Sequence, residues 1–113
     1  MAAIANLTID QGATFTSDVT VKDANGNAFN LTGYTASAKM AKGYSSTRTR
    51  TSLTCTISTP ATSGIVTLAL TADQTTSLED GRYVYDLEIL QTSSSTVTRV
   101  IEGIITVRPQ VSI

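Results

Sequence analysis

The sequence contains no histidine and no tryptophan, and it has one cysteine among its 113 residues. Without imidazole, catalytic arrangements of the Ser-His-Asp or Cys-His type and zinc sites built on histidine are excluded. Without tryptophan, and with 5% aromatic residues, the chain offers little for a surface that stacks sugars. The single thiol, Cys55, alternates with Leu53 and Ile57 in SLTCTIS, so we expect it to face the core, with no internal disulfide.

Charge is also sparse, at 15% of residues with a formal net charge of −1. This balance predicts no general attraction to nucleic acid or to an anionic membrane. No apolar run approaches the roughly 20 residues of a membrane span, and MAAIANLTID lacks the basic start and apolar centre of a signal peptide. The charges are either solvated or form complementary faces on neighbouring copies. The basic group is Lys39, Lys42, Arg48 and Arg50, and the acidic group is Glu79, Asp80, Asp86, Glu88 and Glu102.

Apolar and polar residues alternate with a period of two along most of the chain. Such alternation predicts half-buried strands, and Asn25-Gly26 and Gly103 mark a hairpin turn and a bulge or bend in the last strand. Thr71 and Gln74 have the spacing of a capping box, which predicts a short helical turn before the last two strands. We predict about seven strands in one antiparallel sandwich. The core should contain Phe15, Val19, Val21, Leu53, Ile57, Val66, Leu68, Leu70, Tyr85, Leu87 and Ile105.

The stretch LEDGRYVYDLEI, which starts at Leu78, has the pattern of a tyrosine corner. In immunoglobulin-like sandwiches, a tyrosine near the start of a late strand bonds back to the backbone of the crossover before it. Glu79, Gly81, Tyr83 and Tyr85 match this pattern in order, with Tyr83 as the corner residue. We therefore predict an all-β, immunoglobulin-like fold. It should occupy residues 1–113 as a single domain, with short arms at 1–6 and 109–113.

The chain resembles the small Ig-like domains of tailed-phage virion proteins, including the N-terminal domain of baseplate upper proteins and short structural proteins of cyanophages and related marine phages. The matching features are the L-x-x-G-x-Y-x-Y-D run from Leu78 to Asp86, the Glu102-Gly103 pair, and the opening NLTIDQG. This resemblance implies a non-enzymatic component of a bacteriophage virion without a cofactor. It would be a capsid decoration or cement protein, or an adaptor in the neck, tail or baseplate. Its partners would be capsid or tail subunits and further copies of itself.

The sequence contains only weak indications of a catalytic, calcium-binding or nucleic-acid-binding site. Asp86 and Glu88 lie two apart on one strand, which favours a solvated face over a catalytic carboxylate pair. DANGN at 23–27 resembles the start of a calcium loop, but its glycine is misplaced and Tyr34 stands where the last acid belongs, so we favour a hairpin turn. One tyrosine among a few basic residues is a weak sign of nucleic-acid binding. We instead predict that the basic segment 42–51 contacts protein partners, through Lys42, Tyr44, Arg48 and Arg50.

The sequence leaves two functions open. The first is assembly, because strand edges without proline can pair with neighbouring subunits and terminal arms can reach across them. The second is a carbohydrate-binding or host-adhesion module displayed on the particle, which the small number of aromatic residues disfavours. We expect neither a metal nor a catalytic site.

Overall fold

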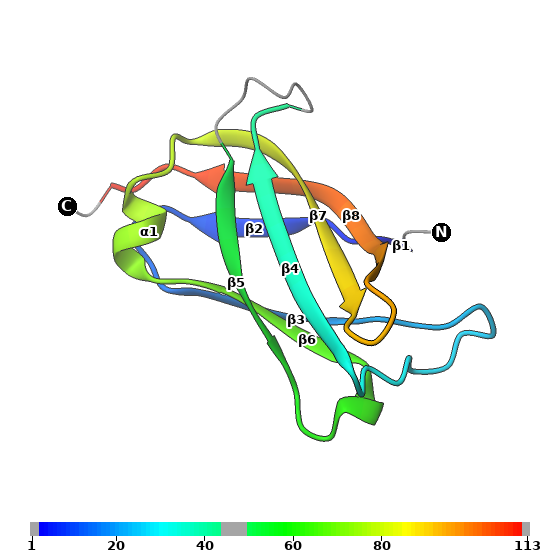
Figure 1. Ribbon diagram of the computed structural model, residues 1–113. Coiled ribbons are helices and arrows are strands. Elements are labelled where there is room, and N and C mark those ends of the chain that lie inside the picture. Colours follow the sequence, from blue (N-terminus) through cyan, green and yellow to red (C-terminus); the bar gives the residue numbers. More distant parts are fainter. Residues whose placement is uncertain (1–2, 44–49, 112–113) are drawn as a thin grey trace.

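The structure, a computed structural model, describes residues 3–43 and 50–111, and most of its regular structure is β-strand (Figure 1). The predicted all-β fold is confirmed. In the described residues the helical pieces are a five-residue helix, α1 (Ala72–Thr76), and a 3-10 turn, η1 (Ala61–Ser63). The strands are β1 (Ala3–Ile4), β2 (Leu7–Asp10), β3 (Phe15–Thr20), β4 (Tyr34–Ala41), β5 (Thr51–Ile57), β6 (Ile65–Leu70), β7 (Gly81–Gln91) and β8 (Thr96–Arg108).

The strands form two layers that share β5. In the larger sheet β1 and β2 pair with β8, β8 with β7, β7 with β4, and β4 with the first residues of β5. In the smaller sheet β3 pairs with β6, and β6 pairs with the later residues of β5. Figure 1 shows β4 and β5 side by side at one end and separating toward the other. The fold is therefore an immunoglobulin-like sandwich in which β5 joins the two layers along one side.

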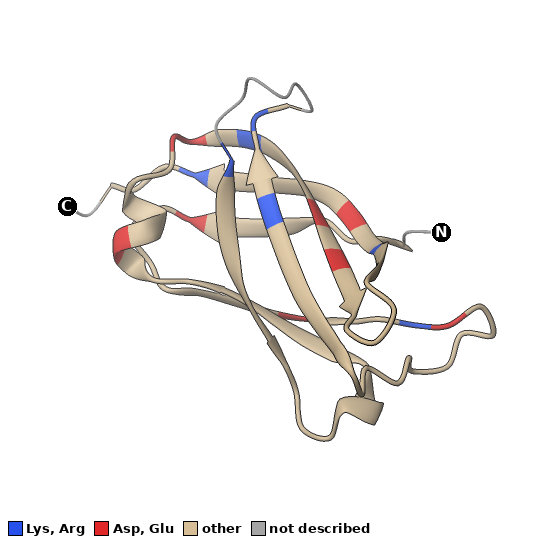
Figure 2. Cartoon of the chain, in the orientation of Figure 1, with Lys and Arg blue, Asp and Glu red and all other residues tan. Residues whose placement is uncertain are grey.

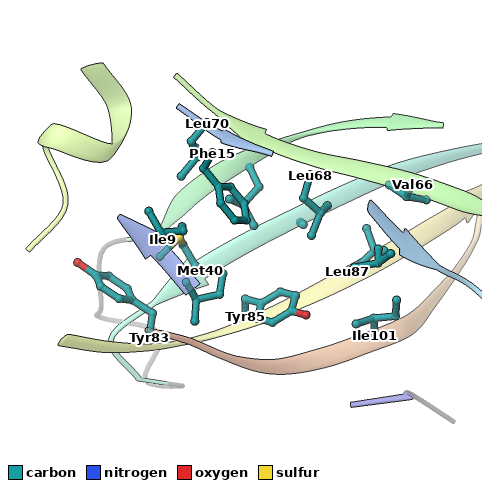
Figure 3. Close-up of a cluster of buried hydrophobic side chains, with 14 of the residues drawn as sticks. Ile9, Phe15, Met40, Val66, Leu68, Leu70, Tyr83, Tyr85, Leu87 and Ile101 are labelled. Atoms are coloured by element: carbon teal, nitrogen blue, oxygen red, sulfur yellow. The ribbon is translucent and has the colours of Figure 1, made fainter. Parts of the chain in front are cut away.

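The core lies between the two sheets and contains side chains from both (Figure 3). Every predicted core residue is buried except Ile57, which is half-buried and packs against the others. Cys55 is likewise half-buried against the core, and burial raises the pKa of its thiol, as expected for a residue that faces inward. Further buried apolar residues complete the core: Ile9, Leu31, Ala38, Met40, Leu78, Tyr83, Ile89, Ile101 and Val107.

The N-terminal segment corrects two predictions. Residues 3–6 are not a free arm, because β1 and the following β2 pair with β8 of the same chain. Both pairings are parallel, so the sandwich is not purely antiparallel. The alternation Leu7, Ile9 continues in β2, and Ile9 is fully buried. At the other end, Gln110 donates its backbone N–H to Gln11 Oε1 at 3.0 Å, which ties the start of the C-terminal segment to the domain.

Gly103 allows another segment of the backbone to pass close to β8. The bulge in β8 does not lie at Gly103, where it was predicted. Leu87 pairs with Ile101 and Glu88 with Arg99, which makes Val100 the extra residue in β8. At Gly103, an added Cβ would overlap the carbonyl oxygen of Ala5. A glycine within a strand marks either a bulge or another backbone passing close by. In this chain the N-terminal segment is the backbone that passes.

The local turn predictions hold. The Thr71 hydroxyl accepts the Gln74 N–H at 3.2 Å, and the Gln74 side-chain oxygen accepts the Thr71 N–H at 2.8 Å, which is the predicted capping box. In DANGN, the Asp23 carboxylate accepts the N–H groups of Asn25 and Asn27 at 2.9 and 3.0 Å, as a turn requires. No helix in the described ranges has the length and apolar character to span a bilayer.

Candidate interaction surface

The tyrosine corner is present where the sequence predicts it. The Tyr83 hydroxyl donates to the Glu79 carbonyl oxygen at 2.9 Å across the entry to β7. Leu78 is buried just before this turn, and Gly81 has a φ of +125°, a conformation that side-chain-bearing residues rarely adopt. Tyr83 therefore fixes the crossover between the two sheets and is only 7% exposed, so it is a structural residue.

Tyr85 reaches a different part of the chain. Its hydroxyl donates to the carbonyl oxygen of Ala5 at 2.5 Å, which fixes the N-terminal segment over Gly103. Burial raises the pKa of Tyr85 to about 12. The sequence pattern placed Tyr85 in the core, and its hydrogen bond to a residue 80 positions away is visible only in the fold.

Lys42, one of the residues predicted to contact a partner, forms its contacts within its own chain. Its Nζ donates to the Asp80 carbonyl oxygen at 2.9 Å and lies 3.4 Å from the Glu79 carboxylate. The same ammonium lies 5.3 Å from the centre of the Tyr83 ring. An ammonium over an aromatic face is attracted by the ring electrons. Lys42 thus supports the tyrosine corner from the end of β4. Arg50 is exposed just before β5, and Tyr44 and Arg48 lie outside the described residues.

The outward face of the larger sheet, which we call the outer face, carries an apolar row that the sequence analysis missed. Ala41 on β4 lies opposite Val84 on β7, and Val84 lies opposite Ile104 on β8. Ile104 is 38% exposed, Val84 is half-buried and Ala41 is buried. The sequence did indicate this row, because Val84 and Ile104 are apolar at positions where the alternation of apolar and polar residues predicts polar ones. Their adjacency follows only from strand register.

Charged side chains lie beside this row on the outer face. The next row across the strands is Lys39, Asp86 and Glu102, and Figure 2 shows acidic positions on β7 and β8 and a basic position on β4. Arg99 links the two acids, with its guanidinium 3.4 Å from Asp86 and 3.7 Å from Glu102. Exposed pairs of this kind contribute about 0–1 kcal/mol each. These pairs therefore contribute little to the stability of the domain.

A hollow of about 320 Å³ lies over β4 and β7 on this face. Its lining includes Lys39, Arg50, Asp86 and Glu88, so charges of both signs surround it. The described residues contain no group of three or more potential metal-ligating side chains. The outer face therefore combines a short apolar row, charged residues beside it and a hollow.

Aromatic side chains are not displayed in the described part of the chain. Phe15, Tyr83 and Tyr85 are buried, and Phe29 and Tyr34 are half-buried in an edge-to-face pair with centroids 5.4 Å apart. A sugar-stacking platform needs an accessible ring face. The described residues offer none that is fully exposed.

No protein-family model and no curated protein matches the sequence. Among solved structures, the chain is similar to InlP of Listeria monocytogenes, with 16% identity and a TM-score of 0.49 over 95% of this chain; it spans 28% of the length of that protein. It is also similar to the Lin-41 filamin domain, with 19% identity and a TM-score of 0.47 over 89% of this chain and 82% of that one. At these values neither similarity identifies a family.

Proposed function

We propose that this domain is a non-enzymatic assembly protein that binds other proteins through the outer face of its larger sheet. The observation that carries the proposal is the apolar row Ala41, Val84 and Ile104, bordered by charges on the same face. Interfaces that form between folded proteins have an apolar centre and a polar rim. The charges would set the orientation of the partner, and the apolar row would supply most of the attraction.

The resemblance to Ig-like domains of tailed-phage virion proteins supports a place in a phage particle. We propose that the chain is a capsid decoration or cement protein, or an adaptor of the neck, tail or baseplate. Particles repeat their subunits many times, and many weak contacts held together give strong attachment. The matching L-x-x-G-x-Y-x-Y-D residues build the tyrosine corner, so they support the fold of such a domain, while the outer face supplies its binding surface.

The test compares incorporation of two lysine variants into particles. Ile104→Lys introduces a charge into the apolar row, whereas Thr56→Lys adds the same charge to an exposed position of β5 that lies outside this face. Both variants should remain folded, with melting temperatures close to that of the wild type, because both sites reach solvent. We expect the first variant to lose incorporation and the second to retain it, as measured by quantitative mass spectrometry of purified particles.

Three outcomes separate the parts of this proposal. Incorporation of Ile104→Lys at the wild-type copy number would show that the outer face is not the contact surface. Absence of the wild-type chain from purified particles would contradict the virion role itself. Specific binding of the isolated domain to a glycan array would favour the carbohydrate-binding alternative.

A further inference from the structure

The smaller sheet ends in a strand edge that has no partner in this chain. β3 pairs with β6 along its whole length, from Phe15 opposite Leu70 to Thr20 opposite Ile65. On its other side, the described residues form no ladder. The sequence of β3, FTSDVT, contains neither proline nor lysine, the residues that commonly protect such edges. Its unpaired backbone groups are therefore available to another strand.

A hollow borders that edge. β2 is the strand that follows across the turn, but it pairs in parallel with β8 and so belongs to the other sheet. Between β2 and β3 lies a hollow of about 370 Å³. Its lining comes from both strands and the turn that joins them. It consists of Asn6, Leu7, Thr8, Asp10, Ala13, Thr14, Phe15, Thr16 and Ser17.

We propose that β3 pairs with β3 of a second copy of this chain, antiparallel about a two-fold axis at Ser17. The pairing joins the smaller sheets of two copies into one continuous sheet. A two-fold contact of this kind uses the same edge on both copies, so one unprotected strand is sufficient.

The side chains of β3 select this register. Residues opposite each other must lie on the same face of the sheet. An axis at Asp18 would place two carboxylates directly opposite each other, which is destabilising. An axis at Ser17 instead places Asp18 opposite Thr16 of the second copy and Phe15 opposite Val19. Of the registers that avoid the two carboxylates, it pairs the most residues of β3.

Within one chain, the Asp18 carboxylate already accepts a hydrogen bond from a threonine on the neighbouring strand. On the β6 side, the Thr67 hydroxyl donates to Asp18 Oδ1 at 2.6 Å, and Thr67 is the residue directly opposite Asp18. In the proposed dimer, Thr16 of the second copy offers a hydroxyl from the other side. The carboxylate then lies between two threonines on one exposed face. Cross-strand hydrogen bonds of this kind favour one register over its neighbours.

Disulfide trapping tests the axis directly, in a Cys55→Ala background that removes the native thiol. Residues opposite each other in an antiparallel pair have Cα atoms about 4.5–5.5 Å apart, within disulfide range. Ser17→Cys should therefore convert to a covalent dimer on mild oxidation. Thr20→Cys is the control, because the axis at Ser17 separates the two introduced thiols by several residues. Equal trapping of both variants, or trapping of Asp18→Cys instead, would overturn the proposed register.

Sedimentation of the native sequence tests the dimer without new thiols. Wild-type protein should show a mass that rises from monomer to dimer with concentration. Ser17→Lys should remain monomeric, because the axis places the two introduced ammonium groups directly opposite each other, and like charges in that position are destabilising. Ser17→Thr is the matched control and should dimerise. A wild-type chain that stays monomeric at every concentration, or a Ser17→Lys variant that still dimerises, would overturn the proposal. The pairing extends the assembly role proposed above, but it is tested on the purified chain, so its failure leaves the outer-face proposal standing.

Discussion

At the scale of single residues, two tyrosines on the same face of β7 have different tasks. Tyr83 bonds to Glu79, four residues before it, and so closes a local turn. Tyr85 bonds to Ala5, at the other end of the chain. The spacing of the two tyrosines accounts for their shared burial, because residues two apart on a strand face the same side.

Tyr83→Phe should lower the free energy of unfolding by roughly 1–2 kcal/mol, the scale for losing a buried hydrogen bond and leaving its acceptor without a partner. Urea unfolding of the two proteins at neutral pH measures the difference. An unchanged midpoint would contradict the structural role of the corner hydroxyl.

Lys42 gives a second prediction at this scale. Lys42→Ser removes the hydrogen bond to the Asp80 carbonyl and the contact with the Tyr83 ring, and should cost about 1 kcal/mol. Lys39→Ser is the control, since Lys39 forms no ion pair among the described residues, and should change stability by less than about 0.5 kcal/mol. Equal effects in thermal melts would show that the corner does not depend on the lysine. A combined replacement of Lys42, Arg48 and Arg50 would therefore disturb the fold as well as any partner contact.

At the scale of elements, the N-terminal strands and β8 depend on each other. β1 and β2 add to the larger sheet only because β8 carries a glycine where Ala5 passes. The Asn6 side chain strengthens this contact, since its Oδ1 accepts the Ile104 N–H at 3.1 Å. The N-terminal segment is therefore part of the sheet, and its sequence is constrained by the sequence of β8.

Gly103→Ala should displace the N-terminal segment. An added methyl group overlaps the Ala5 carbonyl oxygen, so residues 3–10 should lose hydrogen-exchange protection while β4 and β7 keep theirs. Gly26→Ala is the control. Gly26 also has a positive φ, of +83°, but an added Cβ there meets no atom within 4 Å. It should reduce stability modestly without releasing the N-terminus. Retained protection of residues 3–10 in Gly103→Ala would contradict this account.

At the scale of the whole molecule, alkaline pH should weaken the domain through Tyr85. In the folded state burial raises its pKa from 10.0 to about 12. Above pH 10 the unfolded chain therefore loses this proton while the folded chain keeps it, so stability is complete below that pH and falls as pH rises toward 12. Tyr85→Phe should be less stable than the wild type at neutral pH, because the Ala5 carbonyl loses its donor. It should lose less of its own stability through the alkaline window, as measured by urea unfolding. Parallel losses in both proteins would contradict the assignment.

Removal of metal ions should leave the whole domain unchanged. The Asp23 carboxylate already accepts two N–H groups of its own turn, and the described residues contain no cluster of metal-ligating side chains. The melting temperature should therefore be the same with and without EDTA. A fall of several degrees would favour the calcium loop at 23–27.

The sequence by itself determined the features whose partners lie close along the chain. Alternation determined the strands and most of the core, the spacing of Thr71 and Gln74 determined the helix cap, and the order Glu79, Gly81, Tyr83 determined the corner. In each case the contacts span a few residues or repeat with the period of a strand, so a local pattern is sufficient.

The tertiary structure alone decided which distant residues meet. It places Ala3 beside Ile101, brings Lys42 over Tyr83, and aligns Val84 with Ile104 in an apolar row. Each of these contacts depends on the register between strands, and a shift of one residue would turn the same side chains to the opposite face. The sequence pattern does not specify that register across long separations. The candidate binding surface and the free edge of β3 are both consequences of it.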